Sequence, residues 1–272
     1  MPTIIFTGLD GMLLPSEEFD GDRVAAIVKD LQQKNIPLIP VTSHTRAEVE
    51  VLIEKIGLND PIVVEHGSGI FIPQDNNNFK TAETEVLDSY YLHQLGCTYT
   101  EARAALKAVQ EEISKILRGF GDLDEANIQA MMGGISSVAA RRAKSREFSE
   151  YFLTPSRLEI GKLQEVAEEY GFKIVPGNKL SLVMGSGGNP ATAVNWLKNN
   201  YRSNNSDSVV TVGIGTIPQD LSLLDAVDLA IVVPTSVGID LRVADKNWQT
   251  VSSTGTEGWQ QAIAKIFEEN IN

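Results

Sequence analysis

The stretch from Thr3 to Leu14, which reads TIIFTGLDGMLL, decides the fold of this chain. Ile4 to Thr7 are residues that favour β-structure, and they lead into a loop with two glycines and one carboxylate, Asp10. A short apolar run of this kind is typical of a strand buried in a sheet. We therefore predict a first strand that ends in a ligand site, because open α/β sheets bind ligands at the carboxyl ends of their strands.

Segments with strand and helix periodicity then alternate, and this alternation predicts parallel strands joined by right-handed crossovers. The predicted strands are 4–7, 36–41, 61–64, 70–73, 208–212 and 229–232, and the predicted helices are 18–34, 45–56, 191–199, 220–226 and 259–269. Between residues 81 and 186 the pattern changes to long helices and few strand-helix-strand units. We therefore predict an α/β core formed by residues 1–80 and 189–272, with an α+β cap inserted at residues 81–188.

Composition limits the classes of function. The 272 residues carry a formal net charge of −13, which argues against a nucleic-acid surface and offers no basic face to an anionic membrane. The single cysteine, Cys97, excludes an internal disulfide. No signal-peptide pattern and no apolar run of about 18 residues is present, so we expect a soluble cytoplasmic protein.

The first strand and its loop resemble the first motif, D-x-D-G, of the haloacid dehalogenase-like (HAD) phosphatases. In that family the first Asp attacks phosphorus and the second acts as acid and base. The second Asp is present here as Asp10, followed by Gly11, but Gly8 stands at the nucleophile position. The resemblance thus implies a HAD-like Rossmannoid core with a cap of the C2 type, and a lost nucleophile.

The second and third motifs of the family can also be placed. Ser43, in the run VTSHTR, matches the hydroxyl residue that holds the phosphoryl group, although taken alone it is better explained as a helix N-cap. The third motif supplies a Lys that steadies the charge of the nucleophile. Pro190 stands at that position, where it suits the first turn of a helix but cannot act as a cation.

The fourth motif, which provides the magnesium-binding Asp, corresponds to GIGTIPQD at residues 213–220. Thr216 replaces the metal-binding Asp, whereas Asp220 is retained. Magnesium prefers carboxylate oxygens in near-octahedral geometry. The resemblance implies Mg²⁺ as cofactor, but Asp10 and Asp220 alone form a poor site, so we expect weak or absent metal binding.

The cap gives a narrower resemblance, to the mannosyl-3-phosphoglycerate phosphatases. Its REFSE run at residues 146–150 matches their R-E-[YF]-S-E, and EHGSGI at residues 65–70 matches their E-N-G-x-x-I. A position that is usually Arg in that family holds Lys179. The residues that the resemblance places at the substrate are Ser43, His44, Arg46, Glu65, His66, Arg146, Ser149, Glu150 and Lys179.

Alternatives remain open for several of these residues. Arg146 can bind a carboxylate or phosphate of a ligand with two parallel hydrogen bonds, or it can form ion pairs within the cap, as can Glu150. A metal site at His44 and His66 is conceivable, but without an evident third ligand, hydrogen-bonding or packing roles explain these histidines more simply.

Our leading hypothesis is a pseudophosphatase that binds a small anionic sugar-phosphate-like ligand, or a protein partner, without turnover. Loss of a covalent nucleophile costs on the order of 10⁴–10⁶ in rate in well-studied enzymes. The alternative is an active phosphatase, similar to mannosyl-3-phosphoglycerate phosphatase, that hydrolyses a sugar phosphate monoester with Asp10 and Asp220. A third hypothesis, from another class, is an interaction scaffold with an empty cleft.

Overall fold

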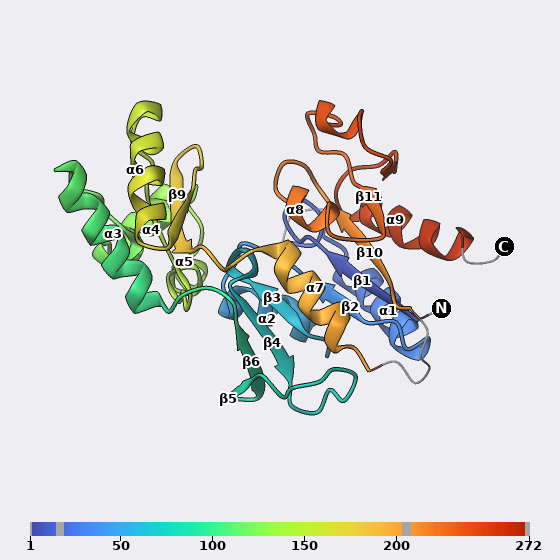
Figure 1. The fold of residues 1–272 in the computed structure, drawn as a ribbon. Coiled ribbons are helices and arrows are strands. Elements are labelled where there is room, and N and C mark those ends of the chain that lie inside the picture. The colour runs from blue at the N-terminus through green and yellow to red at the C-terminus, as the bar shows by residue number, and fades with distance from the viewer. Residues whose placement is uncertain (1, 15–18, 203–207, 270–272) are drawn as a thin grey trace.

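The computed structural model describes residues 2–14, 19–202 and 208–269. The chain forms two lobes (Figure 1). The larger, which we call the core lobe, contains both chain ends, and the smaller, which we call the cap lobe, contains the elements from α3 to β9. The chain passes from the core lobe to the cap lobe after β6 and returns before α7.

The core lobe is organised around β1 (Thr3–Thr7), the central strand of a parallel sheet with the order β12-β11-β10-β1-β2. Its neighbours are β10 (Val210–Gly215) and β2 (Leu38–Pro40), followed outward from β10 by β11 (Leu229–Val232) and β12 (Gln249–Thr250). Ile4, Ile5 and Phe6 are fully buried. The predicted buried first strand and the α/β fold are therefore confirmed.

Helices cover both faces of this sheet, because the side chains of β1 alternate between two apolar clusters. Ile5 packs with α1 (Gly21–Gln33), α2 (Arg46–Ile56) and α9 (Gly255–Glu269). Ile4 and Phe6 pack with α7 (Pro190–Asn200) and α8 (Leu221–Leu224) on the opposite face. Residue 18, the predicted start of the first helix, lies outside the described residues.

A second sheet of the core lobe departs from the predicted topology. It has the order β3-β4-β6-β5, formed by β3 (Ile62–Val64), β4 (Gly69–Pro73), β6 (Tyr90–Gln94) and β5 (Glu85–Leu87), and all its pairs are antiparallel. The expectation that the strand at 70–73 runs parallel is wrong. Only the short turn around η1 (Glu65–Gly67) joins β3 to β4, and a parallel pair needs a much longer crossover.

The pairing of β5 and β6 with β4 also bears on the division of the chain. Both strands fall within residues 81–188, yet they extend a sheet of the core lobe. The predicted division at residues 80 and 189 stays a prediction. We propose that the first crossing between the lobes lies after β6, near Gly96, rather than at residue 80.

The cap lobe is built on the antiparallel sheet β7-β9-β8, with strands Ser149–Leu153, Leu180–Gly185 and Phe172–Val175. One apolar cluster joins this sheet to α3 (Tyr99–Ile113) and α6 (Arg157–Glu169). Another cluster joins η2 (Phe120–Asp122), α4 (Glu125–Met131) and α5 (Ser137–Lys144) to Tyr151 of β7. Because β7 contributes to both clusters, helices pack on both faces of the cap sheet.

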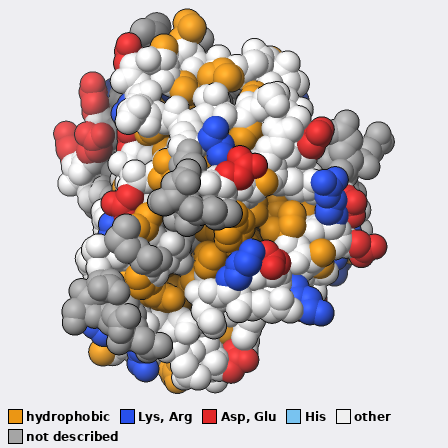
Figure 2. All heavy atoms as spheres, turned by 90° about the vertical axis from the view of Figure 1, so that its right-hand side faces the viewer, with side chains coloured by type: hydrophobic (Ala, Val, Ile, Leu, Met, Phe, Trp, Pro, Cys, Tyr) orange, Lys and Arg blue, Asp and Glu red, His pale blue; other side chains and the backbone are white. Residues whose placement is uncertain are grey.

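The surface of the core lobe that faces away from the cap lobe shows hydrophobic side chains near its centre, with Lys, Arg, Asp and Glu scattered around them (Figure 2). A short 3-10 turn, η3 (Leu241–Val243), lies in the loop before β12. Within the described residues, no helix has both the length and the hydropathy needed to cross a membrane. The predicted cytoplasmic location stays a prediction.

Candidate functional site at the carboxyl ends of the core strands

The loops that follow β1, β2 and β10 meet at one edge of the core sheet and line two neighbouring cavities. The smaller cavity, of about 140 Å³, is lined by Asp10, Ser43 and Pro190 among others. The larger, of about 320 Å³, lies beside Thr216 and the start of α9. Asp10 and Gln219 line both cavities. The fold thus brings the residues of all four predicted motif positions to one place, as β-strand topology requires.

Gly8 is the most consequential departure from the haloacid dehalogenase-like phosphatases, because it stands at the position of their nucleophilic Asp. A Cβ atom at Gly8 would lie 2.5 Å from both Cγ and Oδ1 of Asp220. Real Cβ atoms do not approach other atoms so closely. The Asp220 carboxyl group therefore occupies the space that any side chain at residue 8 would need.

Asp220 is held in that position by the loop after β10. Its Oδ2 accepts hydrogen bonds from the Thr216 backbone N–H at 2.7 Å and from the Thr216 hydroxyl at 3.3 Å. Burial raises the pKa of Asp220 to about 7, and the nearby charge of Asp10 acts in the same direction. The carboxyl group thus changes its charge near neutral pH, while Thr216 fixes its orientation.

His44 lies between two carboxylates. Its Nε2 is 3.0 Å from Asp10 Oδ1, and its Nδ1 is 3.1 Å from Glu48 Oε1. Burial alone would lower the pKa of His44, but the hydrogen bonds to Asp10 and Glu48 outweigh it and raise that pKa to about 10. His44 is therefore a cation at neutral pH and supplies positive charge beside Asp10.

Glu48 reaches His44 because of the way α2 begins. Thr45 is the N-cap of this helix, and its side chain and backbone form a capping box with Glu48. Ser43 is therefore not the cap, and it lines the smaller cavity instead. The Thr-x-x-Glu spacing could have identified this arrangement from the sequence.

His66 has the opposite electrostatic character. Burial, followed by the charge of Arg146, lowers its pKa to about 4, so the ring is neutral at neutral pH. It lines the smaller cavity and has a left-handed backbone conformation with φ of 58°. In the described part of the chain no three His, Cys, Asp or Glu side chains are arranged to hold a metal ion.

The residues present do not fit the magnesium ion that the family resemblance implies. Magnesium needs several hard oxygen donors in octahedral geometry. Thr216 uses its backbone N–H and its hydroxyl to bind Asp220 Oδ2, and Asp10 Oδ1 faces the His44 cation. Few donor oxygens are left to the metal, and weak or absent magnesium binding stays a prediction.

Glu65 and Arg146 connect the two lobes. The Glu65 carboxylate accepts hydrogen bonds from the backbone N–H of Glu147 at 2.7 Å and of Phe148 at 3.2 Å, and from the Ser149 hydroxyl. Arg146 Nε lies 3.3 Å from the same carboxylate, and its Nη2 donates to the Ser43 carbonyl oxygen at 3.0 Å. The side chains of this pair are 0% and 1% exposed. In this arrangement Arg146 binds the core lobe.

The remaining predicted site residues lie farther from the cavities. Arg46 forms ion pairs with Glu147 and Asp88. Glu150 is buried inside the cap lobe and pairs with Arg103 at 2.8 Å. Lys179 is exposed and lines neither cavity that Asp10 lines. Their roles in binding a substrate stay predictions.

Sequence analysis did not single out Lys173, a half-buried lysine of β8 whose ammonium group donates a hydrogen bond to the Gly188 carbonyl oxygen. Gly188 lies just before Pro190 in the segment that returns to the core lobe. Lys173 belongs to no motif, and it is far from Gly188 and Pro190 along the chain. The sequence therefore carries no signal that Lys173 contacts this segment.

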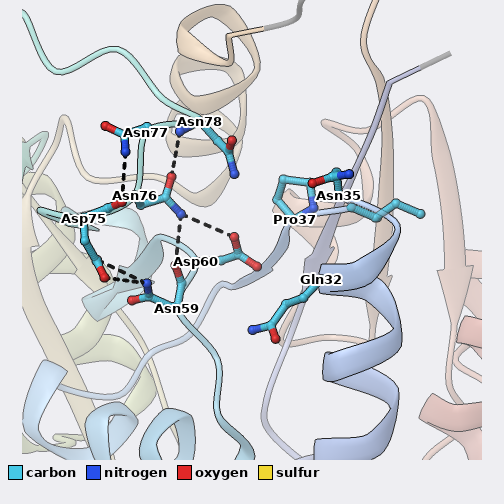
Figure 3. Close-up of a pocket in the computed structure, with 10 residues that line it drawn as sticks. Gln32, Asn35, Pro37, Asn59, Asp60, Asp75, Asn76, Asn77 and Asn78 are labelled. Carbon is cyan, nitrogen blue, oxygen red and sulfur yellow. Dashed lines mark hydrogen bonds between the residues drawn. The ribbon is translucent and has the colours of Figure 1, made fainter.

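A third cavity, of about 510 Å³, lies at the other end of the core sheet, beside the start of β2 (Figure 3). Its polar side chains largely bind one another. Asn59 donates to Asp75, and Asp60 accepts from the Leu38 backbone N–H and, at 3.5 Å, from Asn76. Burial also raises the pKa of Asp60 to about 6. We place the functional site at the smaller cavities, because two residues with shifted pKa values, His66 and Asp220, line the smaller one together with Asp10 and Ser43.

Comparisons with known proteins identify the family of this chain. A sequence profile described as haloacid dehalogenase-like hydrolase matches residues 5–246. The glucosyl-3-phosphoglycerate/mannosyl-3-phosphoglycerate phosphatase of Persephonella marina is 30% identical over 269 residues, which cover 98% of this chain and 97% of that protein. The protein of the same name from Methanococcoides burtonii is 31% identical over 274 residues, which cover 100% of this chain and 100% of that protein. A crystal structure from Thermoplasma acidophilum has a TM-score of 0.65 at 18% identity, covering 99% of this chain and 98% of that one, and so shares the fold.

The junction between the lobes gives a first prediction. Glu65→Gln should lower the free energy of unfolding by about 3–5 kcal/mol, because it leaves Arg146 buried without a countercharge. Urea unfolding measures this loss. Glu85→Gln, at an exposed position of β5, is the matched control and should change stability by less than about 0.5 kcal/mol. A Glu65→Gln protein as stable as the control would show that the ion pair does not hold the lobes together.

The contact at residue 8 gives a second prediction. Gly8→Ala should destabilise the protein by about 1–3 kcal/mol, because the new methyl group overlaps the Asp220 carboxyl group. In an Asp220→Ala background the same change should cost much less, since the space is then free. Urea unfolding of the four proteins of this double-mutant cycle measures the coupling. Additive effects would show that Asp220 does not occupy this space in solution.

Proposed function

The chain belongs to the haloacid dehalogenase-like hydrolases, and we propose that its Asp10 site binds a phosphorylated acidic sugar without magnesium-dependent turnover. Phosphatases of this superfamily typically use Mg²⁺ together with a carboxylate nucleophile. The single observation that carries the proposal is the Asp220 carboxyl group in the space beside Gly8. It excludes a side chain from the position at which the family places its nucleophile.

The groups at the smaller cavity bear on binding of an anion. The His44 cation pairs with Asp10 and so offsets the charge of that lining carboxylate, and Ser43 contributes a hydroxyl group. Below about pH 7 Asp220 is largely neutral, so its carboxyl group can donate a hydrogen bond to a ligand oxygen. Relatives similar along the whole chain are named as phosphatases of glucosyl- and mannosyl-3-phosphoglycerate. A phosphorylated sugar with an acidic group is therefore the ligand class that we propose.

The same observation favours a second candidate function, hydrolysis through Asp220. One carboxylate oxygen of Asp220 would form a bond to phosphorus while the ester oxygen departs with a proton from Asp10. Water would then hydrolyse the acyl phosphate and return the proton to Asp10. Thr216 holds Oδ2, and the carboxyl group lines the smaller cavity. We rank this below binding alone, because the described residues around Asp10 offer few donors for a metal ion that would offset the charge of the phosphoryl group.

Turnover and binding separate the two candidates. We expect wild-type protein with excess Mg²⁺ to release no phosphate from mannosyl-3-phosphoglycerate or from a panel of sugar phosphates above the uncatalysed rate. The same protein should bind mannosyl-3-phosphoglycerate in isothermal titration calorimetry, and Ser43→Ala should weaken that binding. Turnover that is abolished by Asp220→Asn and by Asp10→Asn would instead establish hydrolysis through Asp220. Absence of both turnover and binding would contradict both candidates.

The pH dependence of anion binding gives a further prediction. Sulfate is a suitable probe, because its charge does not change between pH 6 and pH 8. Over this range His44 remains charged and His66 remains neutral, whereas Asp220 loses its proton near pH 7. Sulfate affinity should therefore fall by up to about tenfold from pH 6 to pH 8.

The control for this experiment is Asp220→Asn, whose amide is uncharged at every pH in the range. Its sulfate affinity should be nearly constant between pH 6 and pH 8. A wild-type affinity that does not change with pH, or that rises, would contradict the assignment of Asp220 as the titrating group beside the ligand.

A further inference from the structure

Lys173 is a half-buried cation of the cap lobe without a carboxylate partner. Its ammonium group donates a hydrogen bond to the carbonyl oxygen of Gly188, in the segment that returns to the core lobe. Among the described residues, none of the Asp or Glu side chains comes within ion-pair distance, 4.0 Å, of its Nζ. Burial lowers the pKa of Lys173, and no carboxylate opposes this effect. Two of its three N–H donors remain for another oxygen atom.

The backbone around Gly188 brings this cation near the smaller cavity. A Cβ atom at Gly67 would lie 2.5 Å from Asn189 O and from Pro190 N, so the return segment packs directly on the turn of His66. Pro190 and His66 both line the smaller cavity. The charge of Lys173 also contributes to the lowered pKa of His66. Lys173 does not line the cavity itself, but it binds the segment that leads into the lining residue Pro190, from the side of the cap lobe.

A buried or half-buried charge is costly unless an opposite charge or several hydrogen bonds compensate it. This lysine has one hydrogen bond to a neutral carbonyl oxygen in the described structure. The other lysine considered for the site, Lys179, is exposed to solvent and needs no such compensation. A cation without a carboxylate partner among the described residues, near a cavity that Ser43 lines, is an arrangement that an oxyanion would complete.

We propose that Lys173 forms the cap-side wall of an oxyanion site between the lobes and contacts an anionic group of the ligand. This inference rests on the proposed function, because it names the group that would meet the ligand of the Asp10 site. The oxyanion is either the phosphate or the carboxylate of a phosphorylated sugar acid, and the two sources can be distinguished by the probe.

The test measures the affinities of sulfate, glycerate and 3-phosphoglycerate by isothermal titration calorimetry at pH 6. Lys173→Met keeps the length of the side chain and removes its charge. It should weaken binding by about ten- to a hundredfold, the usual effect of losing a charge-assisted hydrogen bond. Lys173→Arg should retain most of the affinity, and Lys162→Met, at an exposed position of α6 in the cap lobe, should match the wild type.

The probe identifies the anion that Lys173 contacts. Weaker binding of sulfate and 3-phosphoglycerate by Lys173→Met would assign the phosphate, and weaker binding of glycerate and 3-phosphoglycerate would assign the carboxylate. Either result supports the proposal. If Lys173→Met binds all probes as the wild type does, the proposal is overturned while the proposed function stands. If the wild type binds none of them, the proposed function fails as well.

A second measurement separates ligand contact from a purely structural role, in which Lys173 only ties the lobes through Gly188. Acetic anhydride labels accessible unprotonated lysines, and mass spectrometry reports the extent at each site. In wild-type protein, saturating 3-phosphoglycerate should slow acetylation of Lys173 several-fold and leave that of the exposed Lys162 unchanged. Equal labelling of Lys173 with and without ligand, in protein shown to bind it, would overturn the proposal without relying on any variant.

Discussion

Two groups cannot share the volume beside the backbone of residue 8, and the Asp220 carboxyl group fills it here. This packing constraint makes several sequence departures depend on one another. Gly8 must lack a side chain if Asp220 is to lie where it does. Thr216 must then offer donors rather than a second carboxylate, and it does so with its N–H and hydroxyl. An Asp at residue 216 would bring a like charge towards a buried acid whose pKa is already raised.

The charges of the site follow from the same constraint. A cationic side chain at residue 190 would be costly to bury if no carboxylate of residue 8 and no metal ion were present to pair with it. Pro190 avoids this cost and begins α7 in a favourable way. Two other cations lie near the cavity without lining it. His44, from the loop before α2, pairs with Asp10, and Lys173 belongs to the cap lobe.

The sequence was sufficient to predict the α/β fold, because β1 and its loop carry the strongest apolar pattern and the most specific motif. The convergence of Asp10, Ser43 and Asp220 was predicted through the family resemblance, and it is explained by parallel strands whose carboxyl ends meet at one edge of the sheet. The direction of β4 did not, because a short apolar strand does not encode whether its partner is parallel. The position of the Asp220 carboxyl group was also hidden, since it depends on the absence of a side chain at a residue far away in the chain. The partner of Arg146 was hidden for a similar reason, because tertiary packing placed Glu65 beside it.

The junction between the lobes explains why a cap residue could matter to a core site. Glu65 and His66 both have left-handed backbone conformations, with φ of 48° and 58°, which cost free energy in residues other than glycine. The hydrogen bonds of Glu65 to Glu147, Phe148 and Ser149 compensate that cost only while the cap lobe stays in place. The same turn presents His66 to the cavity and packs on the segment whose carbonyl oxygen binds Lys173. The position of the cap lobe and the charge around the cavity are therefore set by one turn, so a ligand that binds Lys173 would act on both.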